Sequence, residues 1–155
     1  MKIESNKIRE LTDEEFDSIA KSNKEEVTLV NIKSLLSDVS LENETKQYFR
    51  AIANFSLLSK EEEYNLAKLA SEGDKFAKDN LFYHNTRLVI SVAKQYLYNR
   101  HTLELMDLVN AGNEGLRIAI DKFDYTMGTR LSTYATSWIR RKIQQEIDNY
   151  DPFIK

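Results

Sequence analysis

Glycine and proline are scarce in this chain, and their scarcity constrains the fold more than any other feature of the sequence. Four glycines and one proline, Pro152, interrupt 155 residues that include many leucines, lysines and glutamates. Turns between strands and long loops depend on glycine and proline, whereas leucine, lysine and glutamate favour helices. We therefore expect an all-α fold, and the length suits one domain with an appendage.

Charge is distributed unevenly along the sequence. Residues 1–80 carry 12 basic and 17 acidic side chains, whereas residues 81–155 carry 10 and 8, within a net charge of −3. Four basic residues and no acidic residue lie between positions 126 and 145. The sequence therefore predicts a local positive surface inside an acidic protein.

The residue types that carry most enzymatic and metal chemistry are missing or isolated. Cysteine is absent, which excludes disulfides and thiolate metal sites and fits a reducing compartment. His84 and His101 stand apart, and the sequence has no phosphate-binding glycine loop. We expect no catalytic residue, no metal site and no cofactor. No apolar run approaches the roughly 20 residues of a membrane span, so we expect a cytoplasmic protein without membrane contact.

Apolar spacing and capping signals predict the first helices. Residues 1–43 form an acidic extension that we expect to be partly helical, with weak amphipathic stretches around 11–20 and 27–36. A helix begins near residue 44 and ends near Asn54. Ser59-Lys60-Glu61-Glu62 then matches a capping box, whose helix has an acidic first turn at 61–63 and stops at Gly73.

The second half of the chain is expected to contain the longest helices. Residues from about 74 to 96 predict one long helix that buries Phe76 and ends at a break over 99–102. A short helix should stop near Gly112, after which Asn113 caps another. A turn at 126–128 precedes the last helix, over about 132–147.

The last helix has two different faces. At about 100° per residue, one face is rich in isoleucine and is expected to point inward. The opposite face carries Thr133, Tyr134, Ser137, Trp138, Arg141, Gln144 and Gln145. Such side chains bind phosphates and base edges, and exposed aromatic rings stack on unpaired bases for roughly 1–3 kcal/mol each. The pattern alone nevertheless favours a simpler interpretation, in which Tyr134 and Trp138 lie on the flank of the core.

Several motifs resemble the bacterial RNA polymerase sigma factors of the primary, sigma-70 type. The core signature of that family is matched at residues 121–125, Gly128, 132–136 and 138–140, and further matches lie at Asn85, 87–89, 91–94, Tyr96, 107–108, 112–113, 115–116 and 57–63. The resemblance covers about residues 44–147. It implies a compact helical bundle of the sigma region 2 type with an N-terminal helical extension. Residues 44–73 would then be region 1.2-like helices, and 74–150 a polymerase- and −10-binding domain.

The resemblance also implies roles for individual residues. Core polymerase, through the clamp coiled coil of its largest subunit, would bind Asp107, Asn110, Gly112, Asn113 and Arg117. Melting of the promoter −10 element and binding of its extruded bases would involve Asn85, Leu88, Phe123, Tyr125, Arg130, Thr133, Tyr134, Ser137 and Trp138, with Asn85 and Leu88 beside the last extruded base. Duplex DNA at the upstream edge of that element would meet Arg140, Arg141, Gln144 and Gln145. Capture of an extruded base offsets an unstacking cost of a few kcal/mol.

The sequence departs from the family pattern at several of these positions. Ser137 replaces one of two adjacent tryptophans, Leu131 and Thr129 replace aromatic residues, and Arg141 and Gln144 replace base-reading residues. Arg141 predicts a preference for guanine at the upstream edge, because arginine pairs with the major-groove edge of that base.

The family continues beyond this helix into domains that are expected to be absent here, namely regions 3 and 4. A second sigma-like or helper protein would then supply −35 recognition. The sequence leaves open whether the chain is half of a split sigma factor, a reduced phage or mobile-element sigma factor, or an excised domain. A rival hypothesis is a polymerase-binding regulator that docks without opening promoters, in which acidic residues 1–43 shield the basic helix.

Overall fold

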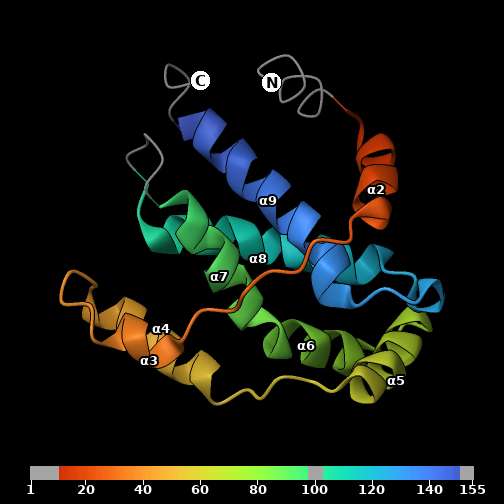
Figure 1. Cartoon of the computed structure of the whole chain (residues 1–155), viewed down its shortest axis with the longest axis horizontal. Coiled ribbons are helices and arrows are strands. Elements are labelled where there is room, and N and C mark those ends of the chain that lie inside the picture. Colours follow the sequence, from red (N-terminus) through yellow and green to blue (C-terminus); the bar gives the residue numbers. More distant parts are fainter. Residues whose placement is uncertain (1–10, 98–102, 151–155) are drawn as a thin grey trace.

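The computed structural model describes residues 11–97 and 103–150, which form helices joined by turns and extended connections (Figure 1). In chain order the elements are α2 (Asp13–Ser22), α3 (Ile32–Leu36), α4 (Asn43–Ala53), α5 (Lys60–Ser71), α6 (Lys75–His84), α7 (Thr86–Tyr96), α8 (Leu105–Lys122), the 3-10 turn η1 (Tyr125–Met127) and α9 (Leu131–Tyr150). The described residues contain no strand, which confirms the all-α prediction. The break expected at 99–102 lies outside them.

Helices α8 and α9 form the centre of the bundle, and α7 packs against both (Figure 1). The two central helices approach each other closely at Gly115. A Cβ atom added there would lie 2.5 Å from the carbonyl oxygen of Trp138 and 2.8 Å from the Cα of Ile139. Both atoms belong to backbone, which cannot move aside as a flexible side chain can. Glycine is therefore needed at this position for the two helices to pack.

Gly112 has a similar packing role, on the side of α8 that faces α7. A Cβ atom added at Gly112 would lie 2.7 Å from Cγ1 of Val89. The sequence predicts a helix stop at this glycine and a new cap at Asn113, and that prediction is wrong, because α8 runs unbroken from Leu105 to Lys122. Burial against neighbouring helices outweighs the low helix propensity of one glycine.

The long helix predicted over residues 74–96 is two helices in the structure, α6 and α7, which run in different directions (Figure 1). Asn85 lies between them with φ −112° and ψ 7°. Its side-chain Nδ2 donates a hydrogen bond of 2.7 Å to the carbonyl oxygen of Leu81, which satisfies a free carbonyl at the end of α6. Phe76 is 75% exposed rather than buried. The break leaves Asn85 at a helix junction.

The local signals in the first half of the chain are confirmed. Helix α4 ends at Ala53, as expected. Ser59 and Glu62 form the predicted capping box at the start of α5, with hydrogen bonds of 3.1 Å and 2.9 Å. Gly73 ends that helix with φ +92°, and the Asp74 carboxylate accepts a hydrogen bond from Ala77 N–H to begin α6. These signals involve residues close in sequence, which explains why they are predictable.

The N-terminal extension is packed onto the bundle. Helix α2 contacts α9, and residues 23–31 then cross the bundle in an extended path to α3, which packs on α4 (Figure 1). Phe16 and Ala20 of α2 are 5% and 0% exposed, and Ile32 and Leu35 of α3 are each 4% exposed. The extension therefore shares the hydrophobic core of the bundle at two separate places.

Candidate nucleic-acid interface

Four aromatic residues that the sequence assigns to DNA binding lie where α8 leads into α9. Phe123 and Tyr125 belong to the connection after α8, and Tyr134 and Trp138 lie one turn apart on α9. The ring centroids of Phe123 and Tyr134 are 5.7 Å apart. Tyr125 meets the ring of Tyr64 from α5 edge-on, at 5.2 Å. We call Phe123, Tyr125, Tyr134 and Trp138 the aromatic row.

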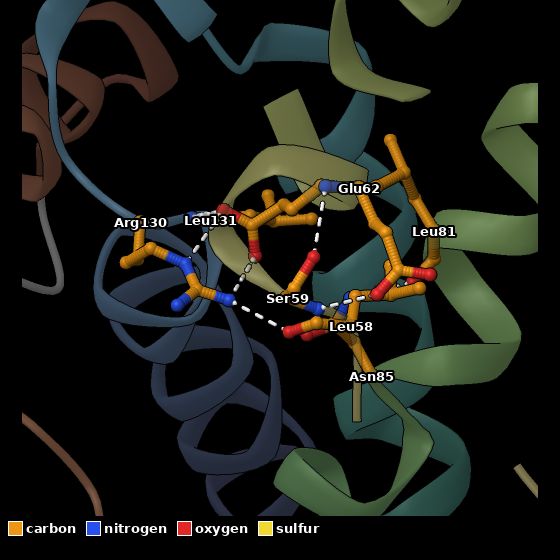
Figure 2. Close-up of polar contacts among 8 residues, drawn as sticks. Leu58, Ser59, Glu62, Leu81, Asn85, Arg130 and Leu131 are labelled. Carbon is orange, nitrogen blue, oxygen red and sulfur yellow. Dashed lines mark hydrogen bonds and ion pairs between the residues drawn. The ribbon is translucent and has the colours of Figure 1, made fainter. Parts of the chain in front are cut away.

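Arg130, also expected to contact DNA, is held by Glu63 of α5 (Figure 2). Its Nε and Nη2 donate to the two carboxylate oxygens at 3.0 Å and 3.3 Å, and Nη2 also donates to the carbonyl oxygen of Leu58. The same carboxylate accepts the backbone N–H of Leu131 at 3.1 Å. Glu63 is 5% exposed. A buried carboxylate therefore fixes the start of α9 and orients Arg130, because acceptors and negative charge are favourable at a helix N-terminus.

A pocket of about 190 Å³ opens beside this ion pair. The side chains that line it include Leu29, Leu57, Leu58, Asn85, Leu88 and Arg130. Four leucines form its apolar walls, and Glu63, His84, Asn85, Arg130 and Ser132 supply polar groups. Figure 2 shows Asn85 and Arg130 on either side of Leu58. The Nδ2 group of Asn85 is engaged by Leu81, so the amide offers its oxygen as an acceptor. The structure places Asn85 and Leu88 in the lining of the same pocket.

Helix α2 covers the end of the aromatic row. The Tyr134 hydroxyl donates a short hydrogen bond to the Asp17 carboxylate, and the Trp138 indole N–H lies 3.2 Å from the same oxygen. The Phe16 ring packs edge-on against Trp138, with centroids 5.0 Å apart. Tyr134 is 3% exposed and Trp138 is 0% exposed. Residues 11–25, which we call the cover segment, therefore occupy the surface predicted to face DNA.

The ionisation of Asp17 favours this contact. Burial raises the pKa of the carboxyl, but hydrogen bonds from Tyr134, Lys21 and Trp138 outweigh it, so the pKa lies below its ordinary value. Burial, followed by the hydrogen bond to Asp17, raises the pKa of the Tyr134 hydroxyl. At neutral pH the pair therefore consists of a carboxylate acceptor and a neutral phenol donor, which is a strong charge-assisted combination.

The two arginines of α9 are also engaged by the cover segment, whereas Lys142 of the same helix pairs with Glu114 of α8. Arg140 forms a two-bonded ion pair with Glu25, at 2.9 Å and 3.1 Å. Arg141 donates to the carbonyl oxygen of Leu11 at 2.7 Å and lies over the Phe16 ring at 4.4 Å.

Polar residues of the same helix face have partners as well. The amide of Asn23 donates to the carbonyl oxygen of Thr133 at 3.0 Å and to the Ser137 hydroxyl at 3.2 Å. Gln144 donates to Asp148 at 3.0 Å, and Gln145 is half-buried.

Of the two interpretations of this helix face, the buried positions of Tyr134 and Trp138 match the core flank and contradict the outward orientation. Their burial does not follow from the bundle alone, because the groups that contact their polar atoms include Asp17 of the extension. The face is amphipathic, and an amphipathic segment of the same chain lies on it. Phe16 and Ala20, four residues apart, supply the apolar contact of that segment.

The residues assigned to polymerase binding divide into two groups on α8. Asp107, Asn110 and Arg117 are exposed and share one side of the helix, whereas Gly112 and Asn113 are buried. Asp107 accepts the backbone N–H of Glu104 at 2.9 Å and so also caps α8. Asn113 hydrogen-bonds the Tyr48 hydroxyl at 3.2 Å, which ties α8 to α4.

Sequence reasoning missed four residues that shape this interface. The sequence places Glu63 only in the acidic first turn of a helix, because its partner Arg130 lies 67 positions away. Phe16, Asp17 and Leu29 lie in the weak amphipathic stretches of the extension. The spacing of Phe16 and Ala20 was the available signal, but nothing in it indicates which surface the stretch covers.

Within the described residues, no three His, Cys, Asp or Glu side chains gather in a way that could hold a metal ion. No helix in this part of the chain combines the length and apolar character of a membrane span.

Two family models match the chain: sigma-70 region 2 over residues 81–151 and sigma-70 factor region 1.2 over residues 45–76. The RNA polymerase sigma factor SigA of Lactococcus lactis subsp. lactis (strain IL1403) is 39% identical over 127 residues, 80% of this chain and 32% of that protein. SigA of Lactococcus lactis subsp. cremoris is also 39% identical over 127 residues, 80% of this chain and 34% of that protein. The chain spans about a third of the length of these curated relatives.

Proposed function

The chain belongs to the sigma-70 family through its regions 1.2 and 2, and we propose that it binds core RNA polymerase and recognises and helps to melt the promoter −10 element. The observation that carries this proposal is the succession of three features from the start of α9 to its middle. The aromatic row, the pocket beside Asn85 and the basic side chains of α9 lie on adjoining parts of the bundle. Single-stranded DNA binds to surfaces that combine these chemistries.

Each feature suits a different part of a melted promoter. An extruded base needs an apolar or aromatic site to offset its unstacking cost, and the aromatic row and the pocket supply such sites. Arg140 and Arg141 suit the phosphates and base edges of the duplex that remains upstream. The DNA path would therefore run from the basic part of α9, past the aromatic row, to the pocket.

Polymerase binding would use the exposed side of α8, on which Asp107, Asn110 and Arg117 lie. The clamp coiled coil of the largest subunit is the partner that this surface would take. Residues 44–73 and 74–150 would act as region 1.2-like and region 2-like parts, with residues 1–43 as an extension.

DNA and the cover segment cannot occupy the same face of α9 at once. Trp138 is fully buried, and Arg141 has a side chain that is 7% exposed beneath the extension. Promoter binding would therefore require the cover segment to leave, and DNA or polymerase must bind the uncovered form better to shift the equilibrium.

The covered face favours one alternative function. A chain whose DNA surface stayed covered after docking would bind polymerase and act as a regulator without opening promoters. The contacts of Asp17, Asn23 and Glu25 with α9 support that possibility. The two functions differ in whether polymerase releases the cover segment.

Transcription with purified core polymerase separates these functions. We expect the chain to co-purify with core and to support transcription from a premelted −10 bubble, where the cost of melting is removed. Co-purification without activity on the bubble would favour the regulator. Failure to co-purify would reject both.

The docking surface can be tested with two identical substitutions. Asn110→Glu adds a charge to the exposed side of α8, whereas Asn65→Glu adds the same charge to an exposed position on α5. We expect only Asn110→Glu to weaken binding to core polymerase, measured by size-exclusion co-elution and surface-immobilised binding. Equal affinities would argue against this side of α8.

A further inference from the structure

The second half of the extension is anchored independently of the cover segment. The backbone N–H of Val30 donates to the Ser91 hydroxyl at 2.9 Å, and that hydroxyl donates in turn to the carbonyl oxygen of Arg87 at 2.8 Å. Ser91 thus accepts one hydrogen bond and donates another, which fixes the position of its oxygen. Ile32 and Leu35 are buried two and five residues later. Neither of these two hydrogen bonds involves α2 or α9.

This anchoring places Leu29 in the wall of the pocket beside Asn85. Leu29 comes immediately before the anchored Val30 and packs against the core as a half-buried side chain. It meets a pocket whose other apolar walls come from Leu57, Leu58 and Leu88. Leu29 lies outside both matched family ranges, 45–76 and 81–151, so the extension adds a wall that those regions do not supply.

We propose that Leu29 is a specificity-determining residue that limits the size of the base accepted by this pocket. The inference rests on the proposed function, because it assumes that the pocket receives an extruded base. Asn85 and Arg130 are held in place by Leu81 and Glu63, so the polar side of the pocket is rigid. A base that enters is therefore bounded by a fixed polar side and by leucines. Removal of the Leu29 side chain would widen this space, which matters more for a two-ring purine than for a one-ring pyrimidine.

The pocket wall stays in place when DNA binds, in contrast to the cover segment. Release of residues 11–25 breaks contacts with α9, whereas Val30, Ile32 and Leu35 keep their contacts with α7 and the core. The extension therefore has two parts with different roles. The first part competes with DNA, and the second part helps to select it.

The test uses the full chain bound to core RNA polymerase and labelled single-stranded −10 oligonucleotides. The base at the last −10 position is thymine, cytosine, adenine, guanine or an abasic site, and affinities are measured by fluorescence anisotropy. Leu29→Ala is compared with Val39→Ala, which changes a 94% exposed residue of the same extension. We expect Leu29→Ala to reduce the preference for pyrimidine over purine by about tenfold, the scale on which apolar pockets discriminate by size. We expect Val39→Ala to leave the preference unchanged.

The outcomes separate the inference from the function on which it rests. Unchanged base preference in Leu29→Ala, with binding intact, would overturn the role of Leu29 and leave the proposed function standing. An equal loss of affinity for every probe, including the abasic one, would also overturn it, because the residue would then support the fold and not selectivity. Absence of −10 binding by the unaltered complex would overturn both proposals. Thermal denaturation of each variant shows whether the fold is retained.

Discussion

Replacement of Asp17 by alanine should uncover Trp138 without unfolding the bundle. Asp17 accepts hydrogen bonds from Tyr134 and Trp138 and pairs with Lys21 at 3.1 Å. Its side chain is 13% exposed, so these bonds are only partly exchanged with water. A hydrogen bond to a charged group contributes about 1.5–3 kcal/mol. Loss of the carboxylate also leaves the buried Tyr134 hydroxyl without its acceptor.

We therefore expect Asp17→Ala to weaken attachment of the cover segment by about 2 kcal/mol, or about 30-fold in its equilibrium constant. Trp138 is the only tryptophan of the chain and is 0% exposed, so its fluorescence reports uncovering directly. The variant should show a red-shifted emission and stronger acrylamide quenching. It should also bind a single-stranded −10 oligonucleotide more tightly.

Glu14→Ala is the matched control, because Glu14 is an exposed acidic residue of the same helix. It removes the same charge, so any difference between the variants reports the contacts of Asp17. Helical circular dichroism should be nearly unchanged in both. Equal quenching in the two variants would contradict the role of Asp17. An accessible Trp138 without a rise in affinity for the oligonucleotide would contradict competition between the cover segment and DNA.

Three further predictions follow from the contacts. Because the pKa of Asp17 is lowered, the carboxylate stabilises the covered state fully above the ordinary pKa of aspartate, and this stabilisation is lost as the pH falls through the lowered pKa. Acrylamide quenching of Trp138 should therefore rise only at strongly acid pH, and Asp17→Ala should lack this transition. Gly115→Ala should lower the free energy of unfolding by about 1–3 kcal/mol in urea denaturation, because the added Cβ would lie 2.5 Å from the backbone of α9. Glu114→Ala changes an exposed position of the same helix and should have little effect. Glu63→Gln should lower the free energy of unfolding by about 1.5–3 kcal/mol, because Arg130 and Leu131 lose a charged acceptor. Glu61→Gln changes an exposed residue of the same turn and should leave the free energy of unfolding unchanged. Equal unfolding midpoints for the two variants would contradict the role given to Glu63.

Features set by residues close in sequence could be predicted, and features set by distant residues could not. The capping box of Ser59 and Glu62 spans three positions, and the turn at Gly128 depends on its own backbone angle, φ +76°. The helix end predicted at Gly112 is wrong, because distant residues decide the structure there. A glycine at this position indicates a helix end locally, but Val89 and Ile139 approach it so closely that the missing side chain instead permits packing within a continuous helix.

Trp138 shows why the candidate site was harder to predict than the fold. An aromatic residue on an amphipathic helix fits both a core flank and a DNA surface, because each partner offers apolar area. The structure buries the ring fully, yet the partners that bury it include Phe16 from a segment more than a hundred positions away. Burial of a side chain within one chain therefore does not exclude a binding role when the segment that covers it is attached separately.

The chemistry of the cover segment matches that of the ligand proposed to replace it. Carboxylates of Asp17 and Glu25 occupy donors on α9 that phosphates or base acceptors would use, and the Phe16 ring packs where a base would stack. The pair between Arg140 and Glu25 is partly exposed, with side chains 30% and 56% exposed, and such pairs contribute at most about 1 kcal/mol. The attachment therefore depends mainly on buried Phe16 and Ala20 and on the hydrogen bonds that Leu11, Asp17 and Asn23 form with α9. These contacts come from one short helix and its two flanks, so a partner that binds only the uncovered face can shift the equilibrium towards release.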